Sequence, residues 1–214
     1  IGEKHGWEIT SVKETETKRV PKPPFTTSTL QQVASTRLGF SPSRTMGAAQ
    51  KLYEAGHITY MRTDSTNLSK EALSQITTEI TKEYGKDSVT PRTFKTKSKN
   101  AQEAHEAIRP TKLSVSSAGS TPEQKKLYSL IRTRTIASQM NDEKLLKTKV
   151  KANLEDASIP DFSVNGSRVL EPGWLTEDTA ARGEDVELPA LSEGEKLTLK
   201  DIDAEAKQTQ PPKR

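Results

Sequence analysis

Tyr60 and Arg62 are separated by one residue in a polar stretch that covers positions 56–67. Side chains alternate faces along an extended backbone, so this pair should point to the same side. A phenolate can attack phosphorus, and a guanidinium can hold phosphoryl oxygens with a planar fork of donors that stays charged at any working pH. The hydroxyls of Thr63 and Ser65 can hydrogen-bond a sugar–phosphate backbone. The stretch therefore favours chemistry on a phosphodiester, although a tyrosine that buries its ring beside a surface arginine is the ordinary alternative.

Two further basic side chains are candidates for the same site. A phenol has an unperturbed pKa of about 10, so Tyr60 needs nearby positive charge or a base to attack at neutral pH. His105 and Arg109 are four residues apart, and they would share one face if Ala101–Ile108 forms a helix. Both could then approach a backbone phosphate. The alternatives are a surface histidine, and an arginine that satisfies the end of a helix.

Three stretches occur in order along the chain: Thr26–Gln32, Gly56–Asn67 and Gln102–Thr111. Together they resemble the cleavage-domain core of bacterial type IA DNA topoisomerases, most closely between Lys22 and Met140 and more weakly towards Arg214. The resemblance implies an ATP-independent isomerase that relaxes negatively supercoiled DNA by transient cleavage of one strand, strand passage and religation. It also implies catalytic roles for Tyr60, through a 5′-phosphotyrosyl intermediate, and for Arg62 and His105. We expect Arg62, Arg109, Thr63 and Ser65 to contact DNA.

The resemblance also implies partners that the chain itself lacks. In the family, Mg²⁺ and the acid for the leaving oxygen belong to a Toprim domain that precedes this region, so we expect this chain to bind no metal and to be inactive by itself. Asp201, Asp203 and Glu205 imitate the acidic triad of that domain, but they lack its glycine-containing extension. A solvated strand end is the expected role of these carboxylates. The expected substrate is DNA that is single-stranded at the cleavage site, in the bacterial cytoplasm at the nucleoid.

Other classes of protein fit less well. A tyrosine recombinase places its arginine and histidine motifs before a tyrosine near the C-terminus, whereas Tyr60 here comes first. A rolling-circle nickase needs two histidines one residue apart, and the three histidines here are scattered. A non-catalytic module that binds single-stranded DNA remains the alternative. Gln31, Gln32, Arg37 and Lys51 are weaker candidates for DNA contact, since a solvated helix face explains them.

Composition sets broad limits on the chain. The 214 residues carry a net charge of +4 with a pI of about 9.1, which permits a polyanionic partner without requiring one. No apolar run reaches the length of a membrane span, and no secretory signal is present. The absence of cysteine excludes disulfides and thiolate metal sites. No phosphate-binding loop of the G-x-x-x-x-G-K-[ST] type indicates nucleotide hydrolysis. The chain begins at Ile1, so we expect it to be part of a longer protein.

The periodicity predicts an α+β fold, in which a mainly helical domain is inserted into a β-rich domain. The resemblance identifies these as a helical domain that carries the nucleophile and a β-rich arch. We assign residues 25–140 to the helical domain and residues 1–24 and 141–214 to the β-rich domain. Helices are expected to begin at Thr27 or Ser28, at Ser41–Pro42, at Ser69, near Ala101 and at Thr121. Strands are expected at 7–17, 146–154, 162–164, 169–170, 186–188 and 197–199.

Overall fold

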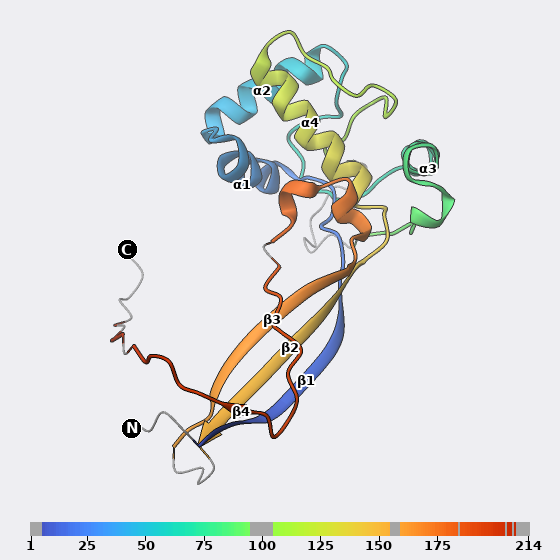
Figure 1. The fold of residues 1–214 in the computed structure, drawn as a ribbon. Coiled ribbons are helices and arrows are strands. Elements are labelled where there is room, and N and C mark those ends of the chain that lie inside the picture. The colour runs from blue at the N-terminus through green and yellow to red at the C-terminus, as the bar shows by residue number, and fades with distance from the viewer. Residues whose placement is uncertain are drawn as a thin grey trace. The chain divides into compact units, whose positions relative to one another are not determined.

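The computed structural model describes residues 6–94, 105–154, 159–183, 185–203, 205–206 and 208. Its elements form an α+β fold, as predicted (Figure 1). The helices are α1 (Thr27–Leu38), α2 (Pro42–Glu54), α3 (Lys70–Tyr84) and α4 (Pro122–Ala137), with short 3₁₀ turns η1 (Lys86–Ser88), η2 (Gly173–Thr176) and η3 (Thr179–Ala181). The strands are β1 (Trp7–Arg19), β2 (Glu143–Leu154), β3 (Phe162–Glu171) and β4 (Lys196–Leu197). None of the described helices is long and apolar enough to cross a membrane.

Contacts within the chain divide it into two compact units. The β-rich unit comprises the described residues of Ile1–Thr17, Leu146–Arg168 and Asp185–Arg214. The helical unit comprises those of Lys18–Leu145 and Val169–Glu184. The sequence assigned residues 1–24 and 141–214 to the β-rich domain, whereas the contacts group 18–24, 141–145 and 169–184 with the helices. Tyr60, Arg62 and His105 all belong to the helical unit.

The four strands form one sheet in the order β3-β2-β1-β4. β1 and β4 are antiparallel, with Trp7 opposite Leu197. Residues 162–164 and 169–170, predicted as two strands, belong to the single strand β3. The strand predicted at 186–188 is wrong, because only Val186 makes an isolated bridge, with Ser167.

Local sequence explains where the helices begin. Ser41 caps α2 with Pro42 in its first turn, Ser69 caps α3, and Thr121 caps α4, as predicted. Helix α1 differs, since its cap is Thr26 rather than Thr27 or Ser28. Thr26 has extended backbone and forms a reciprocal capping box with Thr29, which satisfies two amide groups at once.

Two apolar clusters lie in the helical unit. The larger joins α1, α2 and α4 and includes Leu30, Leu52 and Leu127, all fully buried. Ile58 and Met61, from the loop that carries Tyr60, belong to the same cluster. The backbone on both sides of Tyr60 is therefore fastened to the core of the helical unit.

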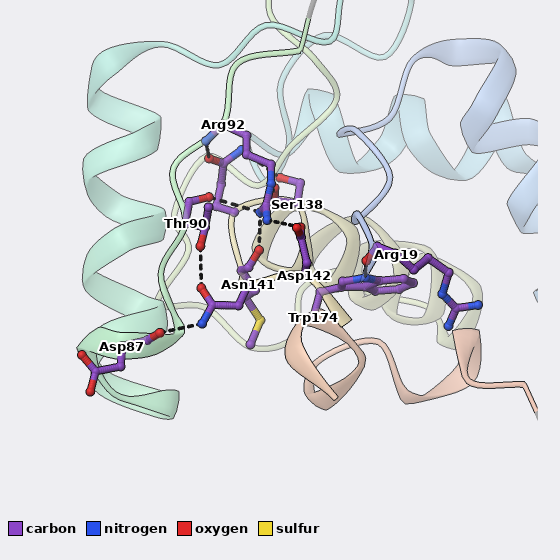
Figure 2. Close-up of polar contacts among 10 residues, drawn as sticks. Arg19, Asp87, Thr90, Arg92, Ser138, Asn141, Asp142 and Trp174 are labelled. Atoms are coloured by element: carbon purple, nitrogen blue, oxygen red, sulfur yellow. Dashed lines mark hydrogen bonds and ion pairs between the residues drawn. The ribbon is translucent and has the colours of Figure 1, made fainter. Parts of the chain in front are cut away.

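The chain that follows α3 is tied to the end of α4 by a group of polar contacts around Arg92 (Figure 2). The Arg92 guanidinium donates to the carbonyl oxygen of Met140, and at 2.6 Å to the carboxylate of Asp142. The Asn141 side chain donates to the carbonyl of Asp87 at 2.6 Å. These contacts fix residues 86–94 and 138–142 against each other within the helical unit.

Candidate active site

The loop between α2 and α3 places Tyr60 and Arg62 on its exposed side. Met61, Thr63 and Ser65 are buried, whereas Tyr60 is 43% exposed and Arg62 is also exposed. This alternation over residues 60–65 is the period-two pattern expected of extended backbone. Burial of the odd-numbered side chains holds the loop down, and it leaves the phenol and the guanidinium free to meet a substrate.

A second segment, residues 105–111, lies beside the loop between α2 and α3 that carries Tyr60. The Thr59 amide donates to the Arg109 carbonyl at 2.9 Å, and the Thr111 amide donates to the His57 carbonyl at 3.0 Å. Isolated bridges pair Ile58 with Pro110, and Phe25 with Ile108. The helix predicted for Ala101–Ile108 is therefore wrong over residues 105–108, while 101–104 lie outside the described residues.

The physical reason for this error lies in hydrogen bonding outside the segment. The Ala107 amide donates to the Asn67 carbonyl at 2.8 Å, and the Ile108 amide donates to the Phe25 carbonyl at 2.8 Å. These amides take partners from distant parts of the chain instead of from the preceding turn. Pro110 also disfavours helical backbone at the residue before it.

This pairing brings His105 beside Tyr60 without any helix. The two ring centroids are 6.4 Å apart and the planes meet at 72°. Tyr60 also contacts Tyr53 of α2, at 5.3 Å between centroids and 67° between planes. Such edge-to-face contacts are the favoured geometry of aromatic pairs and restrict the Tyr60 ring. The sequence analysis did not identify Tyr53 as a neighbour of Tyr60. The signal that could have identified it was a tyrosine in the last turn of the helix that leads into the loop.

A hollow of about 500 Å³ opens beside His105, and Tyr60 is not among the residues that line it. Arg62 and His105 line it together with Asp64, and so do Thr27 and Ser28 from the first turn of α1. The remaining lining residues are Gln31 and Thr63. The first turn of α1 contains no acidic residue, so its partial positive charge adds to that of Arg62. The hollow therefore combines a guanidinium, an imidazole and a helix N-terminus, which suit a phosphate, with the Asp64 carboxylate, whose negative charge opposes one.

Thr63 and Ser65, which the sequence predicts to contact DNA, hold the loop together in this structure. The Thr63 amide donates to Oγ1 of Thr27 at 2.9 Å, and that hydroxyl donates to the Met61 carbonyl at 2.8 Å. The Ser65 amide donates to Oγ1 of Thr63 at 3.0 Å. The loop is thereby pinned to the start of α1, and a contact of these two hydroxyls with DNA stays a prediction.

Arg109 has partners of its own within the helical unit. Its side chain is 11% exposed, and Nη2 donates to Oε2 of Glu106 at 2.6 Å. Oε1 of Glu106 accepts from the Ser69 amide at 2.6 Å. Burial raises the pKa of Glu106, but hydrogen bonds from Arg109 and Ser69 outweigh it and leave this pKa below its ordinary value.

The weaker sequence candidates are dispersed. Gln31 lines the hollow, whereas Arg37 pairs with Asp178 and Lys51 pairs with Glu54. Asp201 and Asp203 are exposed in the β-rich unit. Among the residues that the structure describes, no three histidine, aspartate or glutamate side chains are grouped so that they could hold a metal ion.

The chain is similar to known proteins over almost its whole length. The family model described as DNA topoisomerase matches residues 1–214. DNA topoisomerase 1 of Synechocystis sp. is 42% identical over 221 residues, which cover 97% of this chain and 24% of that protein. DNA topoisomerase 1 of Helicobacter pylori strain 26695 is 41% identical over 226 residues, covering 99% of this chain and 30% of that protein.

A solved structure gives the same result for the fold. Full-length topoisomerase I from Thermotoga maritima matches with a TM-score of 0.77 and 33% sequence identity, over 90% of this chain and 32% of that one. The chain thus spans about a quarter to a third of the length of these bacterial proteins. On the extent of these matches, the chain belongs to the DNA topoisomerase family.

Proposed function

We propose that this chain supplies the nucleophile of a type IA DNA topoisomerase, which relaxes negatively supercoiled DNA through a transient break in one strand. The observation that carries the proposal is the position of Tyr60. Its exposed ring touches His105, next to a hollow that Arg62 and the first turn of α1 also line. The proposed nucleophile Tyr60, the proposed phosphate clamp Arg62 and the further hydrogen-bond donor His105 thus belong to the same helical unit.

The proposed reaction is a transesterification. Oη of Tyr60 attacks phosphorus in a DNA phosphodiester, a bond from phosphorus to the phenolic oxygen forms, and the bond from phosphorus to the 3′ oxygen breaks. The phenolic proton leaves to a base or to solvent, and the 3′ oxygen receives a proton. Religation is the reverse. Because one phosphodiester is exchanged for another, the cycle needs no ATP.

Arg62 and His105 have complementary parts in this step. The guanidinium of Arg62 can bind two phosphoryl oxygens and stabilise the charge that accumulates on them in the transition state. His105 lines the hollow and touches the Tyr60 ring, so its imidazole can hydrogen-bond the same phosphate. The partial positive charge at the N-terminus of α1 adds to that of Arg62 at this site.

The rest of the chemistry is assigned to other parts of the complete protein. The described residues offer no group of side chains that could hold Mg²⁺. We infer that the Mg²⁺ ligands and the acid for the 3′ oxygen lie in a Toprim domain outside this chain. The complete protein then acts on DNA that is single-stranded at the cleavage site, in the bacterial cytoplasm.

The test is capture of the covalent adduct. In the complete protein, Tyr60→Phe should abolish both relaxation and the 5′-phosphotyrosyl adduct on denaturing gels. Tyr53→Phe is the matched control, because it removes a neighbouring phenolic oxygen and keeps the ring contact. An adduct that persists in Tyr60→Phe would refute the assignment of the nucleophile. Undiminished DNA binding by a wild-type protein that forms no adduct would instead favour a non-catalytic binding module.

A further inference from the structure

Glu106 connects two segments beside the nucleophile loop, which comprises residues 55–69 and carries Tyr60. One carboxylate oxygen, Oε1, accepts from the Ser69 amide at 2.6 Å, at the point where the loop ends and α3 begins. The other, Oε2, accepts from Nη2 of Arg109 at 2.6 Å. Glu106 also follows His105 directly in the sequence. A single side chain thus links the end of the nucleophile loop with the segment that carries the histidine.

Arg109 extends the connection to the residue before the nucleophile. Its amide donates to Oγ1 of Thr59 at 2.9 Å, and its carbonyl accepts from the Thr59 amide at 2.9 Å. Nη1 of its side chain donates to the Pro110 carbonyl at 3.0 Å. Thr59, immediately before Tyr60, is therefore held by the main chain of Arg109, while the side chain of Arg109 is held by Glu106.

The burial of Arg109 argues against a role in stability alone. Its Nε atom is buried and has no hydrogen-bond partner among the described residues. A buried donor without a partner among these residues is unfavourable, and an apolar side chain at this position would avoid it. An arginine that carries this cost is better explained by the geometry that its other contacts impose.

We propose that Glu106 and Arg109 are positioning residues that set the place of Tyr60 against His105. This role rests on the proposed function. It assigns to Arg109 a task different from the DNA contact expected from the sequence. A phosphate contact would contribute to affinity and to its salt dependence, whereas a positioning contact contributes to the rate of the chemical step.

The experiment measures single-turnover cleavage and DNA binding separately in the complete enzyme. Glu106→Gln keeps the shape of the side chain and removes its charge. A displacement of about 1 Å at a reacting group can cost about 100-fold in rate, so we expect cleavage at saturating DNA to slow by about 10- to 100-fold. The dissociation constant for DNA, measured in a Tyr60→Phe background, should stay within about twofold, because no phosphate contact is removed. Arg109→Gln should behave in the same way, and Arg109→Lys should recover part of the rate.

Glu79→Gln is the matched control. Glu79 of α3 pairs with Arg132 at 3.0 Å, is buried, and lies in the same helical unit, and neither residue lines the hollow. Loss of this ion pair should lower the melting temperature. The cleavage rate of Glu79→Gln should stay within about twofold of wild type when Glu79→Gln and Glu106→Gln are both assayed well below their melting temperatures. If Glu106→Gln slows cleavage no more than Glu79→Gln does, the pair is only structural. If Arg109→Gln weakens binding and its salt dependence but spares the rate, Arg109 is a DNA contact.

A measurement that does not depend on catalysis separates this inference from the proposed function. With 3-fluorotyrosine placed at position 60 of the complete protein, Glu106→Gln should shift the ¹⁹F resonance of Tyr60, and Glu79→Gln should leave it unchanged. An unchanged resonance in Glu106→Gln would overturn the positioning role, even if Tyr60 is the nucleophile. A shifted resonance in a protein that forms no adduct would overturn the proposed function alone.

Discussion

The hydroxyl of Thr27 offers a quantitative test of how the loop that carries Tyr60 is held. It donates to the Met61 carbonyl at 2.8 Å and accepts from the Thr63 amide at 2.9 Å. Thr27→Val keeps the shape of the side chain, but it leaves that amide and that carbonyl without this partner. The backbone bond from the Thr27 amide to the Thr63 carbonyl, at 2.9 Å, remains.

The expected cost follows from the burial of these groups. An unsatisfied buried polar group costs about 1–3 kcal/mol, and Thr63 and Met61 are buried, at 7% and 5% exposure. Thr27 itself is only half-buried, so water can reach part of the site and the lower half of that range applies. We therefore expect a loss of about 1–2 kcal/mol for the helical unit. For a domain of about 150 residues this lowers the melting temperature by about 2–8 °C.

The assay is urea unfolding followed by the fluorescence of one tryptophan. Trp174 lies in the helical unit and is buried, whereas Trp7 lies in the β-rich unit. In a Trp7→Phe background, Trp174 therefore reports the helical unit alone. Thr36→Val is the matched control, since the Thr36 hydroxyl is exposed on the same helix and donates only to carbonyls of that helix. Equal stabilities for the two valine variants would refute the reasoning.

Three further predictions concern chemistry, charge and completeness. Arg62→Lys should slow single-turnover cleavage by about 100- to 1,000-fold, which is typical of losing one transition-state donor, while DNA affinity changes little. Arg44→Lys on α2 is the control and should leave the cleavage rate unchanged. If Arg62→Lys cleaves as fast as wild type, Arg62 is only a surface cation. Since the pKa of Glu106 is lowered in the folded protein, its contribution to stability is present above the ordinary value of 4.5 and is lost as pH falls below it. Urea unfolding between pH 3 and pH 7 should therefore show wild type and Glu106→Gln converging towards the acidic end, and a constant difference would contradict the sign. The isolated chain should bind single-stranded DNA weakly, with a dissociation constant of about micromolar and strong salt dependence. It should not cut this DNA at any Mg²⁺ concentration. Cleavage by the wild-type chain that is lost in an Asp201→Asn, Asp203→Asn variant would reveal a metal site at these two aspartates.

Much of the local structure could be predicted from the sequence because short-range rules decide it. Ser41 and Ser69 cap their helices through hydrogen bonds that span three residues. Gly39 ends α1 with φ of +66°, a conformation that glycine adopts without a steric penalty. The period-two alternation likewise placed Tyr60 and Arg62 together on the exposed side of their loop.

Contacts between distant segments decided the structure of residues 105–108 and the position of Arg109. Residues 105–108 have a helical pattern, yet their amides bond to Phe25 and Asn67, so the segment is not helical. Arg109 looks like a free cation in the sequence, and only its contacts with Glu106 and Thr59 show that it lies beside the loop that carries Tyr60. The residue types at positions 60, 62 and 105 indicated the chemistry that we propose for the chain. Their distances depend on long-range pairing and burial, which no local pattern encodes, and only the tertiary structure settled them.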